Sequence, residues 1–263
     1  MEWMYTLSGF VVGFIVGVSG VGGGSLMTPL LVLVFGVAPV TAVGTDLLYA
    51  AITKATGVWV HGRRGNVEWK VVGRLALGSI PAALLVLWGM SAMGGTESEQ
   101  FSHLITCALG FALILTAGAL IFREQLQKAG KGISTALSHA GGHGLIYSTV
   151  VSGALLGALV TVSSVGAGAL GVMVLFMLYP RLPTIKLVGS DIAHAVPLTA
   201  LAGFGYLYLG AVDFSLLGSL LLGSLPGIYL GSHAAGWVPE RALRTLLASL
   251  LLLIGSKLVF QFI

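Results

Sequence analysis

Long apolar stretches separated by short polar loops follow one another along the chain. We distinguish eight, and six of them have the roughly 20 residues that one α-helical membrane crossing needs. The other two, residues 4–36 and 145–178, are too long for a single crossing. The eight stretches are residues 4–36, 40–60, 69–90, 100–122, 145–178, 184–207, 214–235 and 240–262.

Small residues interrupt both overlong stretches near their middles. The first interruption runs from Ser19 to Ser25 and the second from Ser163 to Gly168. Each glycine inside a helix costs about 1 kcal/mol relative to alanine, so a glycine cluster favours a break. Each overlong stretch is therefore predicted to be one bent helix or two short helices folded as a hairpin.

The composition predicts a membrane protein. Hydrophobic residues make up 56% of the 263 positions and charged residues only 8%, against about 25% in an ordinary soluble protein. Mean hydropathy is +1.00. A soluble fold of this size could not bury so much apolar surface, so we predict an all-α polytopic protein in contact with the lipid bilayer.

The sequence lacks the usual signatures of an enzyme or a nucleic-acid-binding protein. We find no Ser/His/Asp set, no metal-ligand cluster and no phosphate-binding loop, because no strand–helix unit surrounds the glycines at 20–24. The single cysteine, Cys107, cannot form an internal disulfide. We therefore predict a protein that is not an enzyme, has no cofactor or metal, and does not bind nucleic acid.

The chain contains an internal repeat. Val43-Gly44-Thr45-Asp46 aligns with residues 188–191, and Leu77-Gly78-Ser79-Ile80-Pro81 aligns with residues 222–226, both at an offset of 145 positions. Ser8-Gly9 matches residues 152–153 at an offset of 144. Chance similarity between apolar stretches would not keep register at Asp and Pro. We predict a first transmembrane repeat over 1–122, a cytoplasmic linker over 123–143 and a second repeat over 144–263, integrated in one membrane domain.

The positions of the positive charges favour the hairpin interpretation. Cytoplasmic loops carry an excess of Lys and Arg. If both overlong stretches double back, ten cations fall on one side: Arg63, Arg64, Lys70, Arg123, Lys128, Lys131, Arg181, Lys186, Arg241 and Arg244. If each crosses once, these cations are divided between the two faces.

The hairpin interpretation also sets the topology. It places both termini outside and the loops at 61–68, 123–143, 179–184 and 236–240 in the cytoplasm. The halves then enter the membrane from opposite faces, as the inverted-topology repeats of many secondary transporters do. Each repeat would consist of a glycine-broken helical hairpin and three transmembrane helices. Whether the hairpins are re-entrant or cross fully is left open.

The two breaks are candidates for solute binding. Half-helices beginning near Ser25 and Ala169 would each offer free N–H groups and a partial positive charge of about half a unit, which suits an anion at the membrane midplane. The alternative is that the glycines only permit close helix contact. The predicted substrate-binding residues are Gly20, Gly22, Gly23, Gly24, Ser25, Thr45, Ser163, Ser164, Gly166, Gly168 and Ser190.

Four ionisable residues inside the predicted spans are candidates for coupling or gating. Asp46 and Asp191 either bind protons or cap the free N–H groups of a hairpin. Lys54 aligns with Thr199 in the repeat, and it neutralises Asp46, attracts an anion or reaches to the membrane surface. His194 either relays protons or packs as a neutral side chain. Each must face protein or water, because a charge at the bilayer centre is costly.

The motifs resemble those of the sulfite exporter TauE/SafE family. The resemblance rests on Gly20-Val21-Gly22-Gly23-Gly24 with Pro29, on residues 43–46, and on weaker copies of both in the second half. It covers essentially the whole chain and implies a bacterial inner-membrane permease for sulfite, sulfonates or related sulfur-containing organic anions. The chain departs from the family at Gly166-Ala167-Gly168-Ala169, which is less glycine-rich, and at Asp46 and Asp191, where many members carry a small hydroxyl residue.

Three functions compete at this point. The leading interpretation is a secondary transporter for a small anion, with proton coupling as one mode. An intramembrane aspartyl protease using Asp46 and Asp191 is an alternative, disfavoured because the two residues enter from opposite faces. An anion channel is another. Direction of transport and homo-oligomerisation are left open.

Overall fold

The computed structural model of the chain describes residues 2–19, 24–93, 99–139, 143–234 and 240–260, and these ranges contain eleven helices and no strand. The all-α prediction is confirmed. The helices are α1 (Glu2–Ser19), α2 (Gly24–Leu33), α3 (Pro39–Arg63), α4 (Trp69–Ala92), α5 (Glu99–Ile121), α6 (Arg123–His139), α7 (His143–Ser163), α8 (Ala169–Leu178), α9 (Thr184–Tyr208), α10 (Phe214–Ala234) and α11 (Glu240–Phe260).

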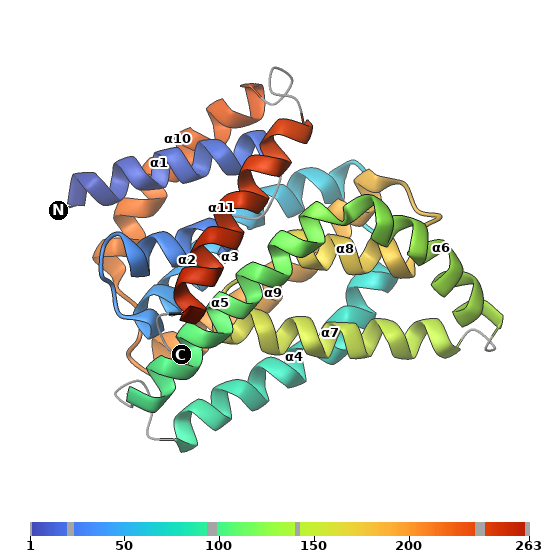
Figure 1. Cartoon of the computed structure of the whole chain (residues 1–263), viewed down its shortest axis with the longest axis horizontal. Coiled ribbons are helices and arrows are strands. Elements are labelled where there is room, and N and C mark those ends of the chain that lie inside the picture. Colours follow the sequence, from blue (N-terminus) through green and yellow to red (C-terminus); the bar gives the residue numbers. More distant parts are fainter. Residues whose placement is uncertain (1, 20–23, 94–98, 140–142, 235–239, 261–263) are drawn as a thin grey trace.

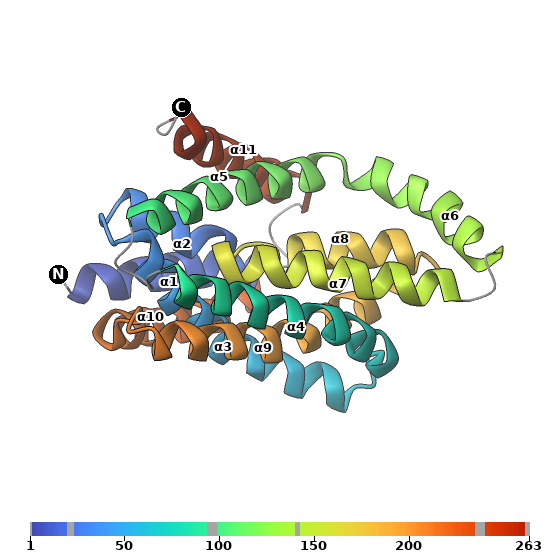
Figure 2. The same ribbon diagram turned by 90° about the horizontal axis from the view of Figure 1, so that it is seen from below.

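Each overlong apolar stretch contains two helices. Residues 4–36 hold α1 and α2, and residues 145–178 hold α7 and α8. Figures 1 and 2 both show α8 running back beside α7 in the opposite direction. Neither stretch is therefore one continuous helix.

Six of the described helices are long and apolar enough to cross a membrane, and they lie within α4, α5, α7, α9, α10 and α11. Their outward faces are apolar: Leu77 and Trp88 of α4 are 69% and 72% exposed, and Leu222 of α10 is 74% exposed. Continuous apolar surface of this kind is not typical of a helix that faces water. It is the surface that lipid chains contact.

The linker between the halves is largely a helix, which its polar composition did not predict. Helix α6 covers Arg123–His139 and packs against α8. At Gly130 the two backbones come so close that a Cβ would lie 2.6 Å from the Cα of Met177. The low hydropathy and the two glycines of this segment are typical of a loop, but one of those glycines makes the helix contact.

Helices from different halves of the chain form the main packing pairs. Helix α1 lies along α10, α4 along α7, α3 along α9 and α5 along α11. Glycines bring the first two pairs into backbone contact. A Cβ on Gly9 would lie 2.5 Å from the carbonyl oxygen of Leu220, and a Cβ on Gly153 would lie 2.3 Å from that of Leu75. The two halves therefore interdigitate.

Helices α3 and α9 end in the same backbone motif. Gly65 and Gly210 adopt φ angles of 66° and 75°. The following amides of Asn66 and Ala211 donate to the carbonyls of His61 and Tyr206, at 2.9 Å in both cases. Glycine is favoured after a helix C-terminus because it takes positive φ without strain.

We expect Gly78→Ala to destabilise the protein, because the new Cβ would lie 1.9 Å from the carbonyl oxygen of Val150 on α7. Overpacking of this kind costs about 1–3 kcal/mol. Gly73→Ala, on the same helix with nothing within 4 Å of the new Cβ, is the matched control and should be neutral or stabilising. Thermal unfolding of both variants in detergent, followed by helicity, measures the difference. Equal melting temperatures would contradict the contact.

Candidate functional site

The second break, residues 164–168, is an irregular turn between α7 and α8. Ser164 has a φ of 57°, and Gly166 and Gly168 have φ angles of 116° and 131°. A positive φ is uncommon for a residue with a side chain. Gly168 caps α8 without a side-chain hydrogen bond, so the start of α8 keeps the partial positive charge of a helix N-terminus.

The first break lies largely outside the described residues. Gly20, Gly22 and Gly23 are among the residues that are not described, whereas Gly24 and Ser25 belong to the first turn of α2. The predicted binding role of these residues stays a prediction.

Asp46 and Asp191 each lie against the short helix of their own half. Asp46 accepts a hydrogen bond on Oδ2 from the hydroxyl of Thr28 in α2. The carboxyl of Asp191 packs directly against Gly171 in the first turn of α8. A Cβ added at Gly171 would lie 1.8 Å from Asp191 Oδ1. Both side chains are at most 1% exposed. Each carboxyl therefore holds the position of a short helix from inside the protein.

One oxygen of each carboxyl is left without a partner. Asp46 Oδ1 and Asp191 Oδ1 are both buried and lack a hydrogen bond. A buried carboxylate oxygen without a donor is costly, which makes these two atoms places for a proton or a bound group. The two carboxyls do not hydrogen-bond to each other, so the structure does not bring them together as a pair that shares a proton.

Lys54 connects the two halves at the second break. Its Nζ donates to the carbonyl oxygen of Ala167 at 2.7 Å, and the ammonium lies within electrostatic reach of Asp191 and Asp46. The repeat counterpart, Thr199, instead donates to Ala195 in its own helix at 2.8 Å. The half-buried lysine therefore points into the protein, and it makes the site asymmetric.

His194 lies deep between α9 and α4. Its Nε2 is 2.8 Å from the hydroxyl oxygen of Ser79, and the side chain is 2% exposed. The repeat counterparts are Tyr49 and Ser224, which also interact. Both pairs join a helix of one half to a helix of the other, so His194 serves at least as a contact between the halves.

Three of the predicted hydroxyl donors are engaged in the backbone of the fold. Thr45 accepts the amide of Asp213 at 3.1 Å, and Ser190 accepts the amide of Glu68 at 2.8 Å. Ser163 donates to the carbonyl oxygen of Leu159 at 2.6 Å. These contacts leave each hydroxyl less capacity to bind a solute.

Ser164 differs from its neighbour. Its hydroxyl is buried without a hydrogen-bond partner and lies close to Asp46. Gly166 and Gly168 shape the turn that holds it. Among the hydroxyls predicted to bind solute whose side chains are described, Ser164 lies beside the Asp46 carboxyl and Thr45 only accepts, whereas Ser163 and Ser190 donate to backbone carbonyls.

Sequence reasoning did not single out Thr28, Gly171 or Ser79. Thr28 and Gly171 stand in apolar runs where a small or hydroxyl residue carries no signal. Ser79 could have been found from the repeat, because it aligns with Ser224 just as His194 aligns with Tyr49.

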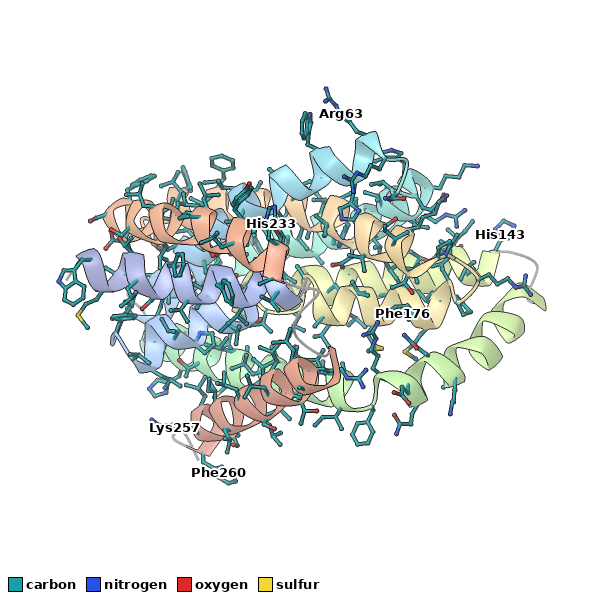
Figure 3. All side chains as sticks on the ribbon, turned by 90° about the horizontal axis from the view of Figure 1, so that it is seen from above. Arg63, His143, Phe176, His233, Lys257 and Phe260 are labelled. Atoms are coloured by element: carbon teal, nitrogen blue, oxygen red, sulfur yellow. The ribbon has the colours of Figure 1, made fainter. Side chains whose placement is uncertain are left out.

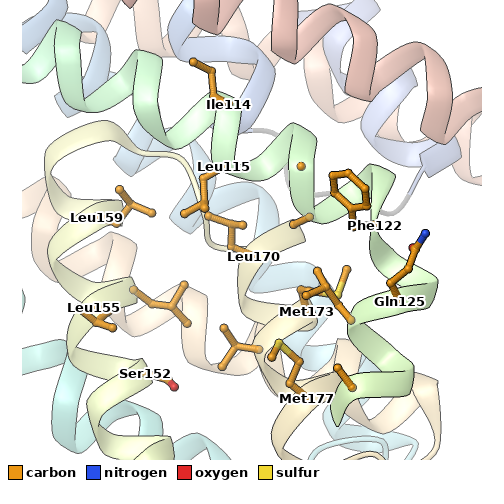
Figure 4. A pocket seen from close by; sticks show the side chains of 16 residues that line it. Ile114, Leu115, Phe122, Gln125, Ser152, Leu155, Leu159, Leu170, Met173 and Met177 are labelled. Atoms are coloured by element: carbon orange, nitrogen blue, oxygen red, sulfur yellow. The ribbon is translucent and has the colours of Figure 1, made fainter.

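A large apolar cavity lies beside this site between α5, α6, α7 and α8 (Figure 4). Its volume is about 780 Å³, and its lining includes Leu115, Phe122, Leu155, Met173 and Met177. None of its lining residues is charged. Apart from Gln125 and Ser152 its lining side chains are apolar, so the cavity suits lipid chains better than an anion.

Six apolar spans and two short helices packed inside the fold define a multi-pass membrane protein. The comparison with known families gives the particular class. The sulfite exporter TauE/SafE family profile matches residues 5–258, and the chain belongs to this family of membrane transporters.

Relatives cover the chain almost from end to end. The probable membrane transporter protein YjnA of Bacillus subtilis is 38% identical over 96% of this chain and 98% of its own length. YdhB of the same organism, also a probable membrane transporter protein, is 26% identical over 95% of this chain and 97% of its own length. The probable membrane transporter protein MJ0441 of Methanocaldococcus jannaschii is 24% identical over 94% of this chain and 91% of its own length. No solved structure matches the chain.

We expect Gly171→Ala to destabilise the protein through its clash with Asp191, by about 1–3 kcal/mol. In an Asp191→Ala background the same added methyl should cost much less, because the carboxyl is gone. Residues in contact give such non-additive effects. Melting temperatures of the wild type, both single variants and the double variant measure the coupling, and purely additive shifts would show that the contact is not made.

Proposed function

We propose that the chain is a secondary transporter that moves a small anion across the bacterial inner membrane through two inverted repeats. The repeats are residues 1–122 and 144–263, joined by the cytoplasmic linker 123–143. The observation that carries the anion assignment is the meeting of Lys54, the buried hydroxyl of Ser164 and the N-terminus of α8 at one helix break.

Matched contacts support the repeat. The hydroxyl of Thr45 accepts a hydrogen bond from the amide of Asp213. The counterpart hydroxyl of Ser190 accepts one from the amide of Glu68. Ser190 follows Thr45 by 145 positions, and Asp213 follows Glu68 by the same offset. A Cβ on Gly44 would meet the carbonyl of Ala211 at 2.3 Å. A Cβ on Gly189 would meet that of Asn66 at 2.1 Å. Each half therefore makes the same contact to the other.

The direction of the helices supports inversion. In Figures 1 and 2, α1 and α7 run in opposite directions, and so do α3 and α9. Both termini lie at the left of Figure 1, opposite α6. Figure 3 places Lys257 on the other side of the molecule from His143. This arrangement fits periplasmic termini and a cytoplasmic linker.

The anion would be held by donors that the fold already aims at the break. Ser164 offers a hydroxyl, Lys54 an ammonium, and α8 the N–H groups of Ala169 and Leu170, because the N–H of Gly171 donates to the carbonyl of Gly166. Helix N-termini and ammonium groups are well suited to anions. Ser190 and Ser163 would shape the site without donating to the solute, because their hydroxyls donate to backbone carbonyls. Thr45 accepts the amide of Asp213 and keeps its own proton to donate.

Asp46, Asp191 and His194 would couple binding to protons. The unpartnered Oδ1 atoms of the two carboxyls are the places where protons bind. A proton there removes the repulsion between the carboxylate and an anion at the break. The family name indicates sulfite as the solute, and sulfonates and related sulfur-containing anions share its chemistry.

Single-cysteine labelling tests the inverted topology. Lys70 and Ser215 are exposed counterparts at the starts of α4 and α10. In a Cys107→Ser background, Lys70→Cys should react with an impermeant maleimide from the cytoplasmic side and Ser215→Cys from the outside. Labelling of both from one side would contradict the inversion.

Flux in proteoliposomes tests the site. Lys54→Gln should lower sulfite or sulfonate uptake by about tenfold or more, because a charged hydrogen bond contributes about 1.5–3 kcal/mol. Ser164→Ala should weaken apparent affinity by about fivefold, since a neutral hydrogen bond contributes about 1 kcal/mol. Ser256→Ala on α11, whose hydroxyl donates to the carbonyl of Leu252 in its own helix, is the matched control with little effect. A wild type that moves none of these anions would overturn the proposed function.

A further inference from the structure

The charges around the second break do not balance. Lys54 is the only Lys or Arg in α3 before Val60. Helices α2 and α8, and the part of α9 after Lys186, contain none. It faces two buried carboxyls, Asp46 and Asp191. With all three groups ionised, the site would carry one uncompensated negative charge.

No other described group supplies the missing positive charge. The remaining titratable side chains packed around the site are one histidine and two tyrosines, and the facing groups on α2, α4, α10 and the break are hydroxyls. They are His194, Tyr49, Tyr206, Thr28, Ser79, Ser224 and Ser164. His194 lies near Lys54, whose charge opposes a second positive charge on the imidazole.

An uncompensated charge buried in protein is costly, so the site favours states of zero net charge. Without solute, neutrality requires that one carboxyl holds a proton and the other pairs electrostatically with Lys54. The unpartnered Oδ1 atoms of both carboxyls can take that proton. When a singly charged anion enters, neutrality requires that the second carboxyl takes a proton too.

Two charges on the solute would exceed what the site can neutralise. With both carboxyls protonated, Lys54 balances one negative charge and leaves the second uncompensated. The repeat counterpart Thr199 is a neutral hydroxyl. A second lysine at this position would change the balance, and this chain does not have one.

We propose that the site selects singly charged anions over doubly charged ones and carries one proton with each anion, so that transport moves no net charge. This inference rests on the proposed function, and it assigns the solute class by charge: sulfonates or hydrogen sulfite, and not sulfate or the sulfite dianion. Lys54 and the two carboxyls set the selectivity together.

Methanesulfonate and sulfate form a matched pair of probes. Both are tetrahedral sulfur oxyanions of similar size, and they differ by one charge. In proteoliposomes, wild-type uptake of methanesulfonate should exceed that of sulfate by about a hundredfold, as expected when one buried charge is uncompensated. An internal pH dye should record one proton for each methanesulfonate, and an imposed membrane potential should not change the rate.

Variants separate charge from structure. Asp191→Asn should keep one proton for each anion, because Asp46 is ionised without solute and takes up a proton with the anion. The double variant Asp46→Asn/Asp191→Asn should carry no proton and make methanesulfonate uptake sensitive to membrane potential. Lys54→Thr, which copies the second repeat, should abolish uptake, and Lys54→Arg should restore part of it. Gel filtration and helicity report whether each variant is folded, and methanesulfonate-induced thermal shifts report its binding.

The outcomes distinguish this inference from the function on which it rests. Equal uptake of sulfate and methanesulfonate, or methanesulfonate uptake that carries current in the wild type, would overturn the charge selectivity and leave an anion transporter. If the wild type transports none of sulfite, methanesulfonate and sulfate, the proposed function fails and the charge selectivity fails with it.

Discussion

The fold depends on backbone contact between helices of different halves. Glycines at the α1–α10 and α4–α7 crossings let carbonyl groups of one helix take the space of a side chain on the other. Lipid chains are as apolar as the helix surfaces, so the hydrophobic effect does not drive helices together in a bilayer. Close van der Waals packing is therefore a main source of helix association in membranes. The first helix of each half is thereby fixed to the other half. The short helix α2 packs against α3 and α5, and the short helix α8 packs against α6, α9 and α5.

This packing explains why a break in α7–α8 is tolerated. Irregular backbone at membrane depth survives only where protein or a polar cavity covers it. Residues 163–165 are buried, the carbonyl of Ala167 accepts from Lys54, and the carboxyl of Asp191 fills the space beside Gly171. The same groups that satisfy the break also bring charge to it, so the structural and chemical roles of Lys54 and Asp191 are not separable.

Hydropathy and the position of the glycines were enough to predict the described helices other than α6 and where the two overlong stretches break, because both signals depend on residues close in sequence. The partners of the site residues could not be predicted this way. Lys54 meets Ala167, and Thr45 meets Asp213, across more than a hundred positions. Which of Ser163 and Ser164 can face the solute depends on the positive φ of Ser164. The amino-acid composition does not predict that torsion angle. Helix α6 was missed because its one decisive contact uses a glycine, which in a polar segment predicts a loop.

Helix α6 lies between the two halves of the chain and packs against α8. It is continuous with the end of α5 and rests with Gly130 on the backbone of Met177. Any axial slide or tilt of α8 would move Met177 relative to Gly130. Because the backbones of α6 and α8 are already in close contact there, α6 would have to shift as well. A displacement of α8 would therefore be passed to α6 through this contact.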